Sequence, residues 1–423
     1  MVDKPMPDLI NEKNKTSSIW PGVIRVAIAL LLLLLSLLNI FPAPVFLLWL
    51  GAIVVNEYGI YLVVFSIILL MGGLGIKRFR KAGTYVLLIA ILLFCVPFFE
   101  AVIAASDFPV DFEYQFPTNK NLQENSGPLI FSSLFKLRHE NPVPFTTYVY
   151  TQSANRQETL DFYLPNLHVS LNSGNRESAV SDTSKNQSLR PCVLVIHGGS
   201  WSGGNSQQLP ELNLVIADKG YAVASINYGL APAIKSPAPL EEVKMALAYL
   251  SANATELHID TNNIVLLGRS AGAQIALLSA YTFHNKNIKG VIDFYGPADM
   301  IWGYSNPSNP LVLNSRKVME DYLGGTYSQV PENYRQSSPI EFASVSSPPT
   351  LLLHGGNDVM VAFEHSRRLN NKLHQLGVRH YLLALPWATH GFDYNLNGPG
   401  GQLSTNLVER FLASVFTFQK PIQ

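Results

Sequence analysis

The sequence predicts an α/β domain with a mostly parallel, doubly wound sheet, preceded by an N-terminal region of apolar helices. Three observations predict this fold. From residue 145 onward, short apolar runs alternate with amphipathic helical stretches. Within that region a Gly-x-Ser-x-Gly motif, Gly268–Gly272, joins an apolar run to a run of small residues. The first quarter of the chain holds apolar runs that are long enough to cross a bilayer.

The composition of the chain excludes several classes of function. The 423 residues are 48% hydrophobic and only 14% charged, with 30 basic and 30 acidic residues. In soluble domains about a quarter of the residues are usually charged. A nucleic-acid-binding protein needs a basic surface. The two cysteines, Cys95 and Cys192, cannot form a disulfide framework, and no Cys and His cluster has zinc spacing. We therefore expect no nucleic-acid partner, no metal and no cofactor.

The apolar runs of the first quarter predict three membrane spans. Val23–Phe41, Tyr58–Gly75 and Tyr85–Ala105 each have the length and hydrophobicity of a span. Pro44–Val55 is short, so we expect an interfacial or re-entrant segment, although a full crossing would give four spans. The first run is not a signal peptide, because further spans follow it and no small-residue cleavage site is evident.

Basic residues predict the orientation of these spans. Lys77, Arg78, Arg80 and Lys81 lie beside a span, which marks the cytoplasmic side. The last span then places the C-terminal domain outside the cytoplasm or in a lumen. Three spans would put the N-terminus in the cytoplasm, and four would put it outside. The alternative interpretation is that the basic cluster only caps a helix. Glu57 is costly in a membrane, so we expect it at the water boundary.

The chain is expected to divide into four parts. Residues 1–20 form an N-terminal tail, and residues 21–105 form the helical region with three spans. Residues 106–144 are polar and contain five prolines, which predicts an irregular linker or a flap over the later domain. Residues 145–423 form the α/β domain. Within it, the Ser- and Asn-rich stretch 166–190 is expected to be a disordered insertion.

Continuous apolar runs without polar alternation are typical of parallel strands covered on both faces. Such runs predict strands at Cys192–Ile196, Tyr221–Ile226, Ile264–Leu267, Val291–Tyr295, Thr350–Leu353 and Tyr381–Leu385, after a hairpin of Thr146–Ser153 and Glu158–Leu164. Helices are predicted at Gln207–Lys219, Pro239–Ala252, Ala271–Phe283, Ala362–Leu376 and Gln402–Phe418. The alternation of strand and helix favours right-handed crossovers and one doubly wound sheet.

Ser270 is the candidate nucleophile. A sharp strand-to-helix turn flanked by glycines lifts the serine hydroxyl out of the sheet, at a helix N-terminus that favours negative charge. A serine needs a base to take its proton, and that base needs a carboxylate to orient it. Asp358 follows the strand Thr350–Leu353, and His390 follows the strand Tyr381–Leu385. Both would lie at the carboxyl edge of the sheet, where the active sites of such sheets gather.

A glycine-rich loop is the candidate oxyanion hole. His197–Trp201 follows the strand Cys192–Ile196, and its glycines allow the backbone to approach a substrate oxygen closely. We expect the N–H groups of Gly198 and Gly199, with Ser200 as a further candidate, to act together with that of Ala271, the residue after the serine.

Taken together these motifs resemble the α/β-hydrolase carboxylesterases. The resemblance rests on His-Gly-Gly-x-Trp, Asn-Tyr-Gly-Leu-Ala-Pro, Gly-x-Ser-Ala-Gly, His-Gly-x-x-Asp and His-Gly-Phe, in this order from about residue 148 to the C-terminus. The most similar subgroups are those related to hormone-sensitive lipase, the small carbohydrate and feruloyl esterases, prenylcysteine methylesterase and kynurenine formamidase. The resemblance implies the α/β-hydrolase fold, with Ser270 as nucleophile, Asp358 as acid and His390 as base.

Two departures accompany this resemblance. Many relatives have Asp-Tyr-Arg where this chain has Asn227–Gly229, so a salt bridge usual in those proteins is expected to be missing. The oxyanion loop has Gly-Gly-Ser where the lipase-like branch has three glycines. A membrane anchor is also unusual for these families, and it leaves the substrate class open.

Alternative roles exist for several of these residues. Ser270 could be a simple helix N-cap, His390 a packing histidine and Asp358 a surface turn residue. Asp299 and Asp393 are the rivals of Asp358 for the acid role.

Other side chains are candidates for the substrate pocket or for packing. His197 and His354 are expected to be structural. Trp201, Tyr228 and Trp302 are candidates for the substrate pocket, with core packing as the alternative for each.

The sequence therefore predicts a membrane-anchored serine hydrolase, most simply a carboxylesterase acting on a small or lipid-like ester. An amidase, formamidase or peptidase could use the same triad. A non-catalytic membrane interaction protein with a hydrolase-like domain is the remaining alternative. The sequence leaves open the acyl length of the substrate, the role of Arg269 and the oligomeric state.

Overall fold

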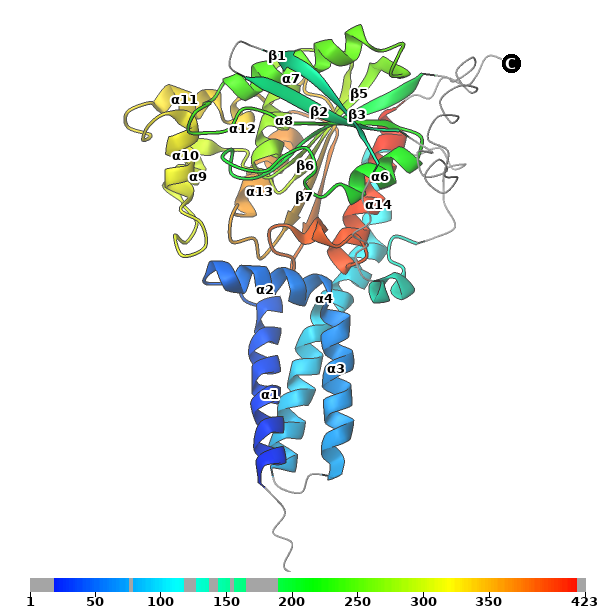
Figure 1. The fold of residues 1–423 in the computed structure, drawn as a ribbon, viewed down its shortest axis with the longest axis vertical. Helices are drawn as coiled ribbons and strands as arrows, with labels where there is room; N and C mark the ends of the chain where they lie inside the picture. The colour runs from blue at the N-terminus through cyan, green and yellow to red at the C-terminus, as the bar shows by residue number, and fades with distance from the viewer. Residues whose placement is uncertain are drawn as a thin grey trace, which may run out of the picture.

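The C-terminal domain is built on one eight-stranded sheet (Figure 1). The computed structural model describes residues 19–75, 79–117, 127–136, 144–152, 156–164 and 189–416. The strands are β1 (Thr146–Gln152), β2 (Gln157–Tyr163), β3 (Arg190–Ile196), β4 (Ala222–Ile226), β5 (Ile259–Arg269), β6 (Ile288–Phe294), β7 (Thr350–Gly355) and β8 (His380–Leu385). Their order is β1-β2-β4-β3-β5-β6-β7-β8. The β1–β2 and β2–β4 pairs are antiparallel and the other pairs are parallel.

The sheet is covered on both faces, which explains its continuous apolar strands. Alternate residues of β3 enter different cores: Cys192, Leu194 and Ile196 pack into one, whereas Val193 and Val195 pack into the other. Helices α7 (Ala238–Ala252), α8 (Ala271–Thr282) and α13 (Glu364–Gln375) supply the first core. Helices α6 (Glu211–Asp218) and α14 (Pro399–Val415) supply the second. The prediction of a doubly wound sheet is confirmed.

A group of short helices between β6 and β7 was not predicted. These are α9 (Met300–Ser305), α10 (Ser315–Leu323), α11 (Pro331–Gln336) and α12 (Pro339–Phe342). Each is too short to show a helical period in the sequence. Together they lie on the carboxyl side of the sheet, where the candidate site is found.

Four helices precede the sheet. They are α1 (Trp20–Ser36), α2 (Phe46–Glu57), α3 (Gly59–Gly72) and α4 (Arg80–Gln115), with short 3-10 turns at Leu37–Asn39 and Gly73–Gly75. Among the described residues, two helical segments, Trp20–Asn39 and α4, are long and apolar enough to cross a membrane. Helices α2 and α3 together form a third candidate, which is bent by 81°. Figure 1 shows α1, α3 and α4 side by side, with α2 lying across the end of this bundle beneath the sheet domain.

The prediction of an irregular linker from residue 106 is wrong for its first part. Helix α4 continues to Gln115, because its last turns pack against the C-terminal domain. Phe112 stacks on Phe116 and meets the edge of Tyr381 in β8, while Phe116 meets Phe411 in α14. A 3-10 helix covers Phe131–Phe135. The other linker residues 118–126 and 137–143, and positions 166–188 of the expected insertion, lie outside the described residues.

Glu57 links the N-terminal helices to the C-terminal domain. Its side chain is buried and its Oε2 atom accepts hydrogen bonds from the N–H groups of Gly400 and Gly401, at 3.1 and 3.4 Å. These N–H groups belong to the first turn of α14, where a carboxylate is favoured by the helix dipole. Glu57 is therefore buried in a protein contact, and its position at the membrane–water boundary stays a prediction.

Candidate active site

The Gly268–Gly272 motif forms a sharp turn between β5 and α8. Ser270 has a φ of 53°, in the left-handed region that L-residues rarely occupy. A Cβ atom at Gly268 would lie 2.3 Å from the carbonyl oxygen of Gly272, and one at Gly272 would lie 2.2 Å from that of Ile196. Only glycine fits either position, so the two glycines allow the strained turn that presents the Ser270 hydroxyl.

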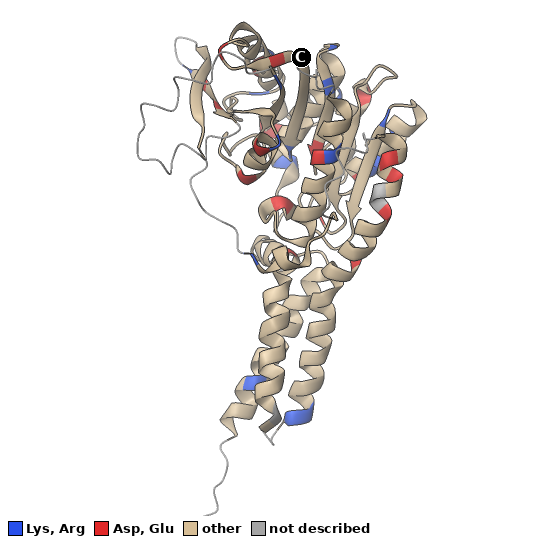
Figure 2. Cartoon of the chain, turned by 90° about the vertical axis from the view of Figure 1, so that its right-hand side faces the viewer, with Lys and Arg blue, Asp and Glu red and all other residues tan. Residues whose placement is uncertain are grey.

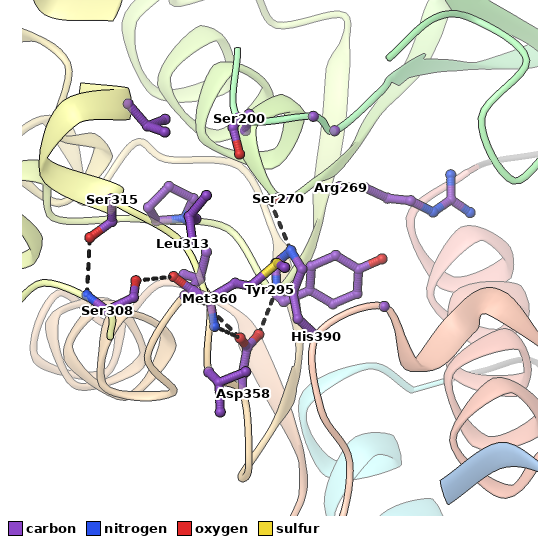
Figure 3. A pocket seen from close by; sticks show the side chains of 18 of the residues that line it. Ser200, Arg269, Ser270, Tyr295, Ser308, Leu313, Ser315, Asp358, Met360 and His390 are labelled. Carbon is purple, nitrogen blue, oxygen red and sulfur yellow. Dashed lines mark hydrogen bonds and ion pairs between the residues drawn. The ribbon is translucent and has the colours of Figure 1, made fainter. Parts of the chain in front are cut away.

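Ser270, His390 and Asp358 form a continuous chain of hydrogen bonds (Figure 3). The Nε2 atom of His390 lies 3.0 Å from the Oγ atom of Ser270, and its Nδ1 atom lies 2.7 Å from the Oδ2 atom of Asp358. Ser270 follows β5, Asp358 follows β7, and His390 follows β8. The structure thus brings together the three residues that the sequence motifs singled out.

Asp358 is held as a buried carboxylate. Its Oδ1 atom accepts hydrogen bonds from the N–H groups of Met360 and Val361, at 2.8 and 2.9 Å. Burial alone would raise the pKa of Asp358, but the charges and hydrogen bonds of His390 and His354 outweigh burial and hold this pKa well below its usual range. Asp358 is therefore ionised at neutral pH, and it can stabilise a positive charge on His390.

His354 is structural, but it also contacts the triad. The ring is completely buried, with Nδ1 2.7 Å from the hydroxyl of Ser366 and Nε2 2.9 Å from the carbonyl oxygen of Val361. The same Nε2 atom lies 3.3 Å from Asp358 Oδ2. Burial lowers the pKa of His354, but the hydrogen bond and charge of Asp358 raise it further than burial lowers it. His354 thus contacts the same carboxylate oxygen as His390.

The oxyanion prediction is wrong for Gly198. Its N–H group donates to the Oε1 atom of Gln208 at 2.7 Å, so it is not free for a substrate oxygen. Gly199, Ser200 and Ala271 all line the cavity beside Ser270. Among the described residues, the loop N–H groups of Gly199 and Ser200 have no hydrogen-bond acceptor. Both residues have positive φ values, of 116° and 54°.

A cavity of about 530 Å³ lies over the Ser270 hydroxyl. This volume is in the usual range of small-molecule sites. Trp201 lines the cavity, and its indole Nε1 donates to Gln274 at 3.0 Å while the ring stacks on Tyr322. Among the described residues, no group of three or more His, Cys, Asp or Glu side chains could hold a metal ion.

Two of the three predicted pocket residues are placed elsewhere. Tyr228 stacks on the His197 ring at 4.3 Å and donates its hydroxyl to the carbonyl oxygen of His197 at 3.0 Å, so it shapes the oxyanion loop from behind. Trp302 packs edge-on against His365. Neither Tyr228 nor Trp302 is among the described residues that line the cavity. Both predictions are wrong because a ring on a loop near the site can pack inward as easily as toward substrate.

Known proteins share these features. The BD-FAE family model matches residues 180–373. Solved structures with the same architecture include a carbohydrate esterase from gut microbiota, with a TM-score of 0.51, 20% identity and coverage of 64% of this chain and 98% of that one. Another is a bacterial heroin esterase, with a TM-score of 0.53, 20% identity and coverage of 65% and 85%. The chain has the α/β-hydrolase fold.

By sequence, the chain is similar to proteins named as carboxylic ester hydrolases. It is 29% identical over 243 residues to the probable carboxylic ester hydrolase LipM of Mycobacterium tuberculosis. This match covers 54% of this chain and 55% of LipM. It is 24% identical over 223 residues to the isoprenylcysteine alpha-carbonyl methylesterase ICME of Arabidopsis thaliana. This match covers 49% of this chain and 52% of ICME. The chain spans about half the length of the curated relatives it matches.

An ion pair lies beside Gly229, where the sequence predicts that the salt bridge of many relatives is missing. A Cβ atom at Gly229 would lie 2.1 Å from Nη1 of Arg156, so a side chain there would have to displace the end of the arginine side chain. Arg156, at the turn between β1 and β2, instead forms an ion pair with Glu242 of α7. Glu242 also accepts a hydrogen bond from the Gly229 N–H at 2.7 Å. A cation thus still pairs with the Glu242 carboxylate although residue 229 has no side chain.

Neither rival for the acid role lies beside His390 Nδ1. Asp299 caps α9 by accepting from the Trp302 N–H, and it forms an ion pair with Arg368 at 2.9 Å. Asp393 accepts from the Nε atom of Arg269 at 2.6 Å and from the hydroxyl of Tyr295. Both carboxylates are therefore engaged elsewhere.

The Asp393 cluster gives Arg269 a role that the sequence left open. Arg269, Tyr295 and Asp393 are all nearly completely buried, and the Tyr295 ring packs on the His390 ring at a centroid distance of 4.4 Å. Burial and the Asp393 charge raise the pKa of Tyr295 well above its usual range, so its hydroxyl stays a donor. Figure 3 shows the Arg269 side chain pointing away from Ser270. The cluster therefore contacts the His390 ring through Tyr295 and helps to hold it in place.

We expect Asp393→Ala to destabilise the protein strongly. The substitution leaves the buried Arg269 guanidinium without its carboxylate, and loss of one partner of a buried ion pair costs about 3–5 kcal/mol. Denaturant unfolding of the detergent-solubilised protein measures this loss. Arg335→Ala, which breaks the exposed ion pair with Glu332, is the control and should change stability little. Equal effects of the two variants would contradict the assignment.

We expect His365 to make the folded state sensitive to acid. Burial, together with the positive charges near it, lowers the pKa of His365 to about 3, and its Nδ1 atom accepts from the Asp299 N–H at 3.3 Å. The unfolded histidine binds a proton below pH about 6.5, whereas the folded one does not, so stability falls as the pH falls from about 6.5 toward 3. Between pH 7 and pH 5 this amounts to about 2 kcal/mol.

His365→Gln tests this dependence, because glutamine keeps an acceptor but does not titrate. The stability difference between wild type and variant, measured by denaturant unfolding at both pH values, should shift by about 2 kcal/mol in favour of the variant at pH 5. Parallel pH curves for the two proteins would show that His365 does not remain neutral in the fold.

Proposed function

We propose that the chain is a membrane-anchored serine hydrolase that cleaves a carboxylic ester through an acyl-enzyme intermediate. The observation that carries this proposal is the hydrogen-bonded chain Ser270–His390–Asp358, which opens into a cavity beside the N–H groups of Gly199, Ser200 and Ala271. Nucleophile, base, acid and oxyanion donors are the complete set that acyl transfer needs. The names of the ester-hydrolysing relatives support the same reaction class.

In the first half of the reaction, the Oγ atom of Ser270 attacks the ester carbonyl carbon while Nε2 of His390 takes the serine proton. Asp358, bound to Nδ1, stabilises the positive ring. The carbonyl oxygen becomes negatively charged and moves toward the three N–H groups, each of which is worth about 3 kcal/mol in the barrier. His390 then gives its proton to the alcohol oxygen as the C–O bond breaks, which leaves an acyl group on Ser270.

In the second half, a water molecule takes the place of the alcohol. His390 removes one proton from this water, and the resulting hydroxide attacks the acyl carbon. The same N–H groups hold the oxygen again. When the intermediate collapses, His390 returns a proton to Ser270 Oγ and the carboxylic acid leaves. Residues of this chain supply every proton transfer in the cycle.

The N-terminal helices are proposed to anchor the enzyme with its active site outside the cytoplasm. Helices α1, α3 and α4 form an apolar bundle, and the N-terminal residues of α4, Arg80 and Lys81, lie at the end away from the hydrolase domain. Figure 2 shows the Lys and Arg residues of the bundle gathered near that end. Basic residues beside spans mark the cytoplasmic side. This arrangement supports three spans with a cytoplasmic N-terminus, and α2 at the opposite membrane surface.

A fluorophosphonate probe tests the proposed function. The probe should label wild-type protein covalently, and mass spectrometry of the digested adduct should place it on Ser270. Hydrolysis of p-nitrophenyl acetate and of the matched amide, p-nitroacetanilide, then separates the reaction classes. Faster cleavage of the ester supports an esterase, and faster cleavage of the amide would replace it by an amidase. Absence of both labelling and turnover would contradict the proposal and favour a non-catalytic membrane protein.

A further inference from the structure

The active-site cavity extends to the N-terminal region, because α2 forms part of its wall. Trp49 and Ile53 of α2 line the cavity together with residues of the hydrolase domain. The indole Nε1 of Trp49 donates to the main-chain oxygen of His390 at 3.1 Å. A helix of the anchor region therefore touches the base of the triad and faces the space where substrate would lie.

The side of α2 turned away from the cavity is an exposed apolar surface. Leu47, Leu50 and Val54 are exposed there, Leu47 at 75%. Phe46, which is also exposed, packs beside Trp49. Phe46–Asn56 contains no charged residue. Since α2 and α3 meet at 81°, a spanning α3 places α2 along the membrane surface. The outer face of α2 then contacts lipid while its inner face contacts the active site.

The contact of α2 with the hydrolase domain is held at both ends. At its start, the Phe46 N–H donates to the Leu311 oxygen at 3.0 Å, and Asn309 donates from its side chain to the Pro44 oxygen at 2.9 Å. At its end, Glu57 binds the first turn of α14. Leu311, which is 68% exposed, thereby extends the apolar surface of α2. The segment around it, with Asn306 to Ser308 and Leu313, also lines the cavity.

The cavity wall beyond the triad is mainly apolar. Leu313, Val318, Met319, Met360 and Val361 line it together with Ile53. The polar groups of Ser308, which also lines the cavity, are bound within the hydrolase domain. The hydroxyl of Ser308 donates to the oxygen of Met360 at 2.8 Å, and its N–H donates to the hydroxyl of Ser315 at 3.0 Å. Such a wall suits an aliphatic chain, which gains by leaving water and needs no hydrogen bonds.

From these contacts we propose that the substrate is a long-chain acyl ester drawn from the bilayer, with Trp49 and Ile53 forming one wall of its acyl-chain subsite. The proposal rests on the proposed ester hydrolysis. The acyl chain leaves the lipid beside the outer face of α2, passes between α2 and the Asn306–Leu313 segment, and brings its carbonyl carbon to Ser270. Water adds across the ester bond, releasing a fatty acid and an alcohol. The position of α2 thus couples the anchor to substrate choice.

The test uses full-length protein in phosphatidylcholine vesicles with two esters that share a leaving group, p-nitrophenyl acetate and p-nitrophenyl palmitate. Ile53→Trp narrows the α2 side of the cavity and should lower kcat/KM for the palmitate by about tenfold or more. The acetate should change less than twofold. Ile68→Trp, the same substitution at an exposed position of α3, is the control and should leave both esters unchanged. Fluorophosphonate labelling of Ile53→Trp confirms that its triad is intact.

A second measurement identifies the source of the ester. At constant total palmitate ester, added phosphatidylcholine in the vesicles should lower the rate in proportion to the surface dilution of the ester. A rate that follows bulk concentration would overturn the bilayer route. Equal loss on both esters, no loss on either, or hydrolysis of the acetate alone by wild type would overturn the subsite while leaving ester hydrolysis intact. Wild type that is neither labelled nor active would instead refute the proposed function, and this inference with it.

Discussion

Ser270→Ala is expected to lower kcat for p-nitrophenyl acetate by about 10⁴-fold or more, with KM little changed. The Oγ atom 3.0 Å from His390 Nε2 is the nucleophile in the proposed reaction, and without it no acyl-enzyme can form. The oxyanion donors and the cavity remain, so the variant should keep a residual rate above that of water. Steady-state kinetics over a range of ester concentrations measures both parameters.

Ser346→Ala is the matched control for this substitution. Ser346 is an exposed serine on a loop before β7 and is not among the described residues that line the cavity, so its substitution should leave the rate unchanged. Circular dichroism and the unfolding midpoint of Ser270→Ala should match those of wild type, because the hydroxyl contributes little to packing. If Ser270→Ala kept more than a tenth of the wild-type rate, hydrolysis would have to use another nucleophile.

The sheet and the triad could be predicted because their signals are local. Each buried strand needs a continuous apolar run, and the turn after β5 needs glycines at two positions where a Cβ atom would collide with the backbone. Asp358 and His390 were found because each follows such a run. Even so, β5 begins at Ile259, before the predicted Ile264, since its polar first residues pair with the start of β3. Pairing with a neighbour is not visible in the hydrophobicity of one strand.

Features that join distant parts of the chain could not be predicted. Arg269 and Asp393 are 124 residues apart, and nothing around either residue indicates a buried ion pair. The same holds for the extension of α4. Its polar residues indicate a linker, whereas the contacts of Phe112 with β8 and of Phe116 with α14 are not visible in the sequence. The wall that α2 gives to the active-site cavity joins residues more than 300 positions apart, as in the bond from Trp49 to His390.

The error at Gly198 has a similar cause. The motif shows which loop forms the oxyanion hole, but not which of its N–H groups is already used. Gln208, ten residues further on, accepts a hydrogen bond from the Gly198 N–H. The N–H groups left for a substrate oxygen are therefore those of Gly199 and Ser200, both of which have positive φ values. A sequence pattern fixes residue types, whereas the direction of an N–H group depends on backbone torsions and on partners elsewhere.

Asp358→Asn is expected to lower kcat by about 10⁴-fold while the fold is kept. The reason lies in the two N–H groups of Met360 and Val361, which both donate to Oδ1 of Asp358. The amide oxygen of an asparagine must take that place, so its NH₂ group points at Nδ1 of His390. The ring then accepts at Nδ1 and carries its proton on Nε2, facing Ser270. In that tautomer His390 cannot take the serine proton.

Asp299→Asn supplies the comparison, because Asp299 is the rival carboxylate that pairs with Arg368 and lies away from His390 Nδ1. Its kcat should stay within a few-fold of wild type, whereas fluorophosphonate labelling of Asp358→Asn should slow in parallel with kcat, since both need a serine that can lose its proton. Similar losses in the two variants would show that Asp358 does not orient the base. A large loss for Asp358→Asn with undiminished labelling would place its role after acylation, in the activation of water by His390.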